Sequence, residues 1–196
     1  MASSDTNLLV LIRDSLAAPG EVASRLLSLR PGLAAVVQAA ALVSILDALL
    51  LGALTGGAFV IPLPDGDVIL DPFTHAALLG ASLLISAVAL FVGGRVLGGR
   101  GQFEQALLVV AWLELLAIVI QVAQLLFSIL LPPVAPILAL AGLFLLIWCV
   151  VQFTRVLHGF GGFGRTILAL LLGAIVVGIA LTILMSVVGF GGSSDV

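Results

Sequence analysis

The run GGRGQFEQA, residues 98–106, is the stretch of this chain that most resembles a phosphate-binding loop. Nucleotide-binding loops of this kind need a lysine, a preceding strand and a following helix. This run has no lysine, and a long apolar segment precedes it in place of a strand. We therefore expect no nucleotide here. The run is interpreted as a connector between two helices, in which Glu104 occupies the favourable first turn of the second.

Polar side chains that interrupt apolar segments are the second candidate for chemistry. Asp47 interrupts one segment, and Glu114 begins a polar stripe in another, because at 100° per residue three later side chains lie within about 80° of it. These three are Gln121, Gln124 and Ser128. The stripe could line a hydrated pathway or a substrate cleft. The alternatives are interhelical hydrogen bonds, worth about 0.6 kcal/mol each, and a partner interface.

No pattern typical of an enzyme is present. We find no Ser/His/Asp or Cys/His pairing, no HExxH and no carboxylates paired at one membrane depth. His75 and His158 are expected on opposite sides of a membrane, so they cannot share a metal, and the single Cys149 excludes a CxxC site. Three aspartates do not follow the spacing of a calcium-binding loop; they are Asp65, Asp67 and Asp71. We expect no cofactor, no metal and no enzymatic activity.

The composition identifies the solvent around these groups. Of 196 residues, 62% are hydrophobic and 9% are charged, and the mean hydropathy is +1.38. A soluble domain is roughly half apolar and a quarter charged. This chain has too few charges to coat a core in water, so lipid must surround it. The net charge of −3 gives no indication of a nucleic-acid partner.

Five apolar stretches are long enough to cross a bilayer, whose core of about 30 Å needs roughly 20 helical residues. The predicted fold is an all-α polytopic membrane protein with spans at 32–54, 75–97, 105–131, 134–157 and 167–188. Residues 1–31 form an amphipathic N-terminal segment, and residues 189–196 form a short tail. Pro132 and Pro133 together lack two amide donors, which predicts a tight antiparallel hairpin of the third and fourth spans.

Arginine placement predicts the orientation. All seven basic residues fall on one side of a five-span arrangement: Arg13, Arg25, Arg30, Arg95, Arg100, Arg155 and Arg165. Cytoplasmic loops carry an excess of basic residues. We therefore expect a cytoplasmic N-terminus and an extracytoplasmic C-terminus, in the inner membrane of a bacterial cell. The first residues lack the basic region of a signal peptide, so no cleavage is expected.

Two segments outside the spans carry their own patterns. The N-terminal segment predicts two short amphipathic helices joined at Pro19. Either they lie flat on the cytoplasmic leaflet, with Arg25 and Arg30 facing anionic headgroups, or they pack under the bundle. Residues 59–71, FVIPLPDGDVILD, predict a small β-hairpin with an Asp-Gly turn at Asp65 and Gly66.

Small residues recur every four positions in the first and fifth spans, which favours close approach of helix backbones. The first ridge is Ala40, Ser44, Ala48, Gly52 and Gly56, and the second is Ala174, Gly178, Thr182 and Ser186. Each ridge packs either within one chain or against a second copy. We favour packing within the chain.

Three stretches carry a resemblance to a known family. They are RDSLAAPGEVASRLLSL at 13–29, GGRGQFEQA at 98–106 and LIWCVVQFTRVLHGFGGFGRTILALLL at 146–172. From about Leu8 to Val188, the chain resembles the prokaryotic branch of the Yip family of Ypt/Rab-interacting membrane proteins. The resemblance implies five spans and a cytoplasmic N-terminus. Eukaryotic relatives carry a longer soluble N-terminal domain, so the resemblance implies no Rab-binding role for this chain.

We therefore expect a membrane-organising or adaptor protein that contacts the lipid bilayer, other membrane proteins or copies of itself, and no nucleic acid or nucleotide. The candidate docking residues are Arg95, Arg100, Phe103, Glu104, Arg155, His158 and Arg165. For His158 the other expectation is a helix cap at the membrane interface. The alternative function is a small permease, channel or lipid-moving protein that uses Asp47 and the Glu114 stripe.

Overall fold

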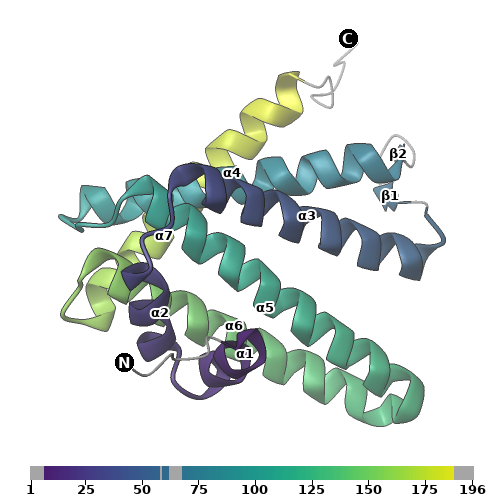
Figure 1. The fold of residues 1–196 in the computed structure, drawn as a ribbon. Coiled ribbons are helices and arrows are strands. Elements are labelled where there is room, and N and C mark those ends of the chain that lie inside the picture. Colours follow the sequence, from purple (N-terminus) through teal and green to yellow (C-terminus); the bar gives the residue numbers. More distant parts are fainter. Residues whose placement is uncertain (1–6, 58, 62–67, 188–196) are drawn as a thin grey trace.

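The computed structural model describes the backbone of residues 7–57, 59–61 and 68–187 (Figure 1). In that part, two short helices precede five long ones, and a two-stranded sheet lies between the first two long helices. The helices are α1 (Leu8–Ala17), α2 (Pro19–Ser28), α3 (Leu33–Thr55), α4 (Pro72–Val96), α5 (Phe103–Leu130), α6 (Ala135–His158) and α7 (Phe163–Val187). A 3-10 turn, η1 (Pro132–Val134), joins α5 to α6.

Among the described residues, five helices, α3 to α7, are long and apolar enough to cross a membrane. This confirms the all-α polytopic fold. Helices α3 to α6 run back and forth beside one another, whereas the second half of α7 diverges from them (Figure 1). The α4 helix begins three residues before its predicted span, because the Asp71 carboxylate caps the amides of Phe73 and Thr74 and Pro72 suits the first turn.

The α5–α6 hairpin forms as predicted around the two prolines. The α5 helix ends at Leu130, and α6 begins only after the three residues of η1. Gly142 marks a close approach between the two helices, since a Cβ atom placed there would lie 2.6 Å from Cγ2 of Ile120. Glycine at this position therefore lets the antiparallel pair pack tightly.

The N-terminal helices pack against the sides of α5 and α6. The indole N–H of Trp112 donates to Oγ of Ser15 at 3.1 Å, and the thiol of Cys149 donates to the Ser15 carbonyl at 3.5 Å. The apolar face of α2 joins the same core cluster. Of the two expectations for this segment, packing with the bundle is therefore the one that the structure supports. The outer face of α1 still exposes Leu8 and Leu9.

Only one of the two predicted small-residue ridges is buried within the chain. Ala40, Ser44 and Ala48 of α3 are buried, whereas the α7 ridge of Ala174, Gly178 and Thr182 is exposed. The prediction for α7 was wrong by one residue. Helix α7 instead crosses α4 through Gly173, whose ideal Cβ position is 3.0 Å from the Ala89 carbonyl oxygen. The Ser186 side chain lies outside the described residues.

The predicted hairpin is present as strands β1 (Phe59–Ile61) and β2 (Val68–Leu70), which pair antiparallel in the register Phe59 to Leu70. Its turn, including Asp65 and Gly66, lies outside the described residues. The hairpin marks one end of the bundle, which we call the hairpin end. At the opposite end α4 and α6 finish and α3, α5 and α7 begin. We call it the arginine end, because it carries Arg30, Arg95, Arg100, Arg155 and Arg165.

Candidate functional site

The glycine-rich run forms the loop between α4 and α5, and it is fastened to the end of α6. Gly98 adopts a positive φ of 79° and turns the chain after α4. The Gly99 amide then donates to the Gly94 carbonyl at 2.9 Å, and the Arg100 amide donates to the His158 carbonyl at 3.2 Å. This last bond joins two of the stretches that carry the family resemblance.

The imidazole of His158 fills the space that the glycines leave. The ring is 2% exposed, and its Nε2 lies 3.1 Å from the Leu90 carbonyl oxygen. A Cβ atom would lie 2.0 Å from Nε2 if placed at Gly94, 2.5 Å from Nδ1 at Gly99 and 2.9 Å from Nδ1 at Gly101. We call Gly94, Gly99 and Gly101 the glycine cradle. These three positions require glycine because the His158 side chain packs so closely against them. In this loop, Gly98 alone requires glycine because of a positive φ.

The burial of the ring closes the His158 side chain to a partner, contrary to the docking expectation, while His158 does lie at the end of α6, as the helix-cap expectation has it. The ring packs against the end of α4 and the α4–α5 loop and is stacked on Phe160 at 5.4 Å between centroids. It is the backbone carbonyl of His158, rather than its side chain, that bonds across to the loop. His158 is therefore a structural fastener of the arginine end.

The other candidate docking residues lie around this fastener. Arg95 lies over the Phe91 ring at 5.8 Å, and Phe91 meets Phe103 edge to face at 6.3 Å. Arg155 lies over the Phe163 ring at 5.0 Å. The remaining three side chains are exposed: Arg100, Glu104 and Arg165. The loops at this end are thus held in place while most of their charges remain accessible.

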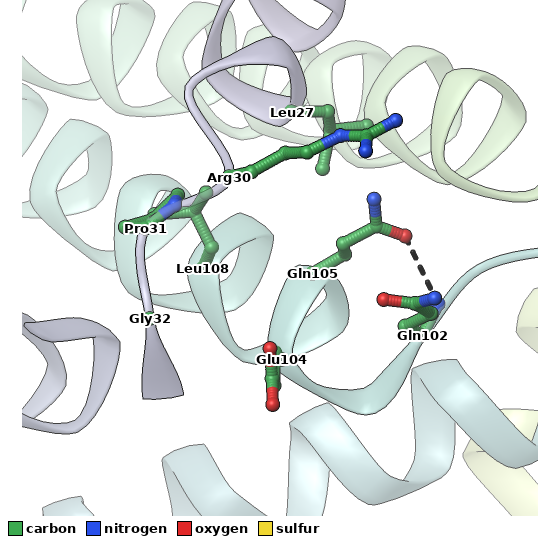
Figure 2. A pocket seen from close by; sticks show the side chains of 8 residues that line it. All are labelled: Leu27, Arg30, Pro31, Gly32, Gln102, Glu104, Gln105 and Leu108. Atoms are coloured by element: carbon green, nitrogen blue, oxygen red, sulfur yellow. Dashed lines mark hydrogen bonds between the residues drawn. The ribbon is translucent and has the colours of Figure 1, made fainter. Parts of the chain in front are cut away.

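Two hollows open at the arginine end. The first, of about 320 Å³, lies between the α2–α3 link and the start of α5 (Figure 2), and its polar side chains are Arg30, Gln102, Glu104 and Gln105. The second is a groove of about 610 Å³ between the α1–α2 junction and α6, lined in part by Pro19, Gly20, Glu21, Trp148, Gln152 and Arg155. We call them the α5 pocket and the α6 groove.

Two side chains that line the α6 groove, Trp148 and Arg155, contact the ring of Phe163 beside it. Trp148 and Phe163 stack with centroids 5.9 Å apart, and the Arg155 guanidinium lies over the Phe163 ring. Trp148 remains 46% exposed and Phe163 43% exposed. Trp148 was not singled out from the sequence, because one tryptophan in an apolar helix gives no signal of its own.

Inside the bundle, ionisable side chains from different helices are withdrawn from solvent. Asp47 of α3 is buried, and Glu114 of α5 is half-buried. Within the described residues, Oδ1 of Asp47 and Nε2 of His75 are buried without a hydrogen-bond partner.

The predicted polar stripe of α5 divides between two hollows. Glu114 lies on an open cavity of about 390 Å³ lined by residues of α4, α5, α6 and α7, whose other lining is almost entirely apolar. Gln121, Gln124 and Ser128 line a separate groove of about 580 Å³ near η1 and the end of α3. The four residues are therefore not brought together as one continuous path. We call the first hollow the Glu114 cavity.

The arrangement of five apolar helices, with arginines at one end and few charges between, defines an integral polytopic membrane protein. A family model described as the Yip1 domain matches residues 13–187. The chain therefore belongs to the Yip1-domain family. Comparison with curated proteins and with solved structures gives no match.

Proposed function

We propose that this protein is a non-enzymatic membrane-organising adaptor that docks partner membrane proteins at its arginine end. The observation that supports this role is the α6 groove, in which Trp148 is exposed and Arg155 lies nearby, both in contact with the Phe163 ring beside the groove. Tryptophan and arginine are enriched among the residues that dominate binding energy in protein interfaces. An amphipathic or membrane-embedded helix of a partner would place apolar side chains on Trp148 and a carboxylate near Arg155.

The setting of the groove supports docking rather than catalysis. One wall is the α1–α2 junction, which Ser15 and Trp112 hold against the bundle. The other is the end of α6, which the glycine cradle fixes through His158. A surface whose side chains are already fixed loses little conformational entropy when a partner binds. We place the protein in the bacterial inner membrane, with the arginine end and the N-terminus in the cytoplasm.

Photocrosslinking in native membranes tests the proposal. A photoreactive residue at Gln152, inside the groove, is expected to give discrete protein adducts that are lost when Trp148→Ala is added. The matched control carries the same probe at Phe73, an exposed residue at the hairpin end, and is expected to give none of these adducts. Lipid adducts alone at Gln152, or the same protein adducts at both positions, would contradict partner docking.

A second function, movement of a lipid or another small amphiphile, is favoured by the Glu114 cavity. One carboxyl in an apolar hollow of about 390 Å³ suits a molecule with an apolar body and a single polar group. Intramembrane carboxyls commonly mark substrate or proton pathways. Liposome flux measurements with the wild type and with Glu114→Gln test this role. Equal rates for both proteins and for empty liposomes would eliminate it.

A further inference from the structure

The α5 pocket contains two opposite charges that the protein does not use for itself. Arg30 and Glu104 both line it. Within the described residues, the side-chain ion pairs are those of Arg13 and Arg25 with Asp14, so neither Arg30 nor Glu104 takes part in one. Both side chains are exposed. Both charges are therefore available to complementary charges of a ligand that enters the pocket.

Hydrogen-bonding groups line the same pocket. In Figure 2 the Gln105 side chain projects toward Gln102, on the side of the Arg30 guanidinium, and its Oε1 accepts from the Gln102 backbone amide at 3.1 Å. This bond belongs to the capping box that begins α5 and fixes the Gln105 amide group. The side-chain NH₂ of Gln105 is left to donate into the pocket. Leu27, Pro31 and Leu108 supply apolar lining beside these polar groups.

The backbone at Arg30 is held in an uncommon conformation. Its φ is +43°, and it is the one non-glycine residue with positive φ in the described part of the chain. Such a conformation costs free energy in a residue with a side chain, and it is retained where the surrounding structure fixes it, often at binding sites. In Figure 2 the guanidinium reaches across the pocket from this position.

The pocket lies at the depth of the lipid headgroups. It is built on the first turns of α5 and on the link that enters α3, so it opens at the arginine end of the spans. Helices α3 and α5 have 23 and 28 residues, whereas the bilayer core needs roughly 20. The helices are thus long enough for their first turns, at the end that carries the arginines, to lie in the headgroup region, where the most abundant ligands are phospholipid headgroups.

We propose that the α5 pocket binds the headgroup of an aminophospholipid, with the phosphate at Arg30 and the primary ammonium at Glu104. An arginine guanidinium matches phosphate oxygens well. The ammonium of ethanolamine donates hydrogen bonds to a carboxylate, which the quaternary ammonium of choline cannot do. A glycerol headgroup lacks the positive charge that Glu104 requires. The apolar lining accommodates the start of the acyl region, which distinguishes a membrane lipid from a soluble phosphate ester.

Native mass spectrometry with an equimolar mixture of phosphatidylethanolamine, phosphatidylcholine and phosphatidylglycerol tests this assignment. The delipidated full-length protein is expected to retain phosphatidylethanolamine roughly tenfold better than either competitor. Glu104→Gln is expected to abolish this preference while total lipid binding persists. Arg30→Gln is expected to weaken retention of all three lipids alike, because each contains the phosphate. Arg30→Lys, which keeps the charge, should restore part of the binding.

Matched controls change the same residue types outside the pocket. Arg165→Gln and Glu21→Gln are both at exposed positions, and neither should alter the lipid preference. Water-soluble phosphoethanolamine should not displace the lipid at equal concentration. An absence of selectivity, an unchanged preference in Glu104→Gln, or equal binding of phosphoethanolamine would overturn the proposal. Crosslinking of a protein partner at Gln105 that persists when phosphatidylethanolamine is in excess would do the same.

Discussion

The His158 side chain and its glycine cradle show how single residues determine the shape of the arginine end. The ring carries a buried Nδ1 without a hydrogen-bond partner in the described residues, so packing must contribute most of its stabilisation. Three glycines lie against the ring, one at the end of α4 and two in the α4–α5 loop. A Cβ atom at any of the three would come too close to the ring. The loop and the end of α6 therefore depend on one another for their positions.

Gly94→Ala should destabilise the protein, because the new methyl group would overlap the imidazole. Overpacking of this kind lowers the free energy of unfolding by about 1–3 kcal/mol. The midpoint of thermal unfolding in detergent should therefore fall. The matched control is Gly178→Ala, also inside a helix but with open space around it, which should be neutral or stabilise by roughly 0.5–1 kcal/mol. Adding His158→Ala to Gly94→Ala should recover part of the loss. Equal midpoints for the two alanine variants would contradict the cradle.

Asp71 gives a residue-scale prediction about pH. The hydroxyl of Thr74, and then the amides of Thr74 and Phe73, hold the pKa of the Asp71 carboxyl below its ordinary value. Because the folded pKa is depressed, the charged carboxylate stabilises the first turn of α4. This stabilisation is complete at pH values above the unfolded pKa of about 3.9. This contribution is lost as the pH falls through the lower, folded pKa.

Hydrogen exchange at the Phe73 and Thr74 amides measures this loss. Relative to Asp71→Asn, which keeps a capping oxygen but does not titrate, the wild type should lose protection as the pH falls below about 3.9. Amides in the middle of α4 serve as the internal reference. Parallel pH profiles for the wild type and Asp71→Asn would show that the cap does not depend on the charge.

At the scale of elements, Ser15 holds the N-terminal helices against the bundle. Ser15→Ala removes the acceptor of the Trp112 indole N–H. A buried donor left unsatisfied costs about 1–3 kcal/mol, so the α1–α2 segment should become more sensitive to protease and the thermal midpoint should fall. The matched control is Ser24→Ala, an exposed serine whose hydroxyl bonds one turn back to Gly20. If both variants are cut at the same rate, the Ser15 contact does not hold α1 in place.

The elements that could be predicted from sequence are those whose cause is local. Apolar length predicts the spans, and Pro132 with Pro133 predicts the α5–α6 hairpin. Contacts between distant residues were not predictable in this way. The His158 ring meets a carbonyl 68 residues away, and its glycines have the same sequence signature as a turn. The α7 ridge was misjudged because small residues at 169, 173 and 174 give overlapping four-residue repeats.

The residues of the candidate site likewise separate into those that sequence could place and those that only the packed structure could. Glu104 and Arg155 stand out as charges in an apolar chain, so sequence alone could place them in the loops. Arg30 and Gln105 share a pocket only because α2 leads into α3 beside the start of α5. The burial of Asp47 likewise depends on how α3 packs against its neighbours. Side-chain juxtaposition across helices needs the packed structure.

For the whole molecule, the arginines predict opposite exposure of the two ends of the bundle. Moving basic residues across the membrane is disfavoured, and cytoplasmic loops retain them. The chain has a single cysteine, Cys149, which is fully buried. The wild type should therefore resist a membrane-impermeant maleimide, and Cys149→Ala provides a background for new cysteines.

In that background, Phe73→Cys at the hairpin end should react with the maleimide in intact cells, because Phe73 is 87% exposed and the proposed orientation places the hairpin end outside the cytoplasm. Gly161→Cys, in the exposed α6–α7 loop, should react only after the cells are permeabilised. Both variants should label equally in detergent, which controls for intrinsic reactivity. Labelling of both in intact cells would reject the five-span orientation. Labelling of Gly161→Cys alone would invert it, and the α5 pocket would then face the outer leaflet, so a headgroup ligand would have to come from there.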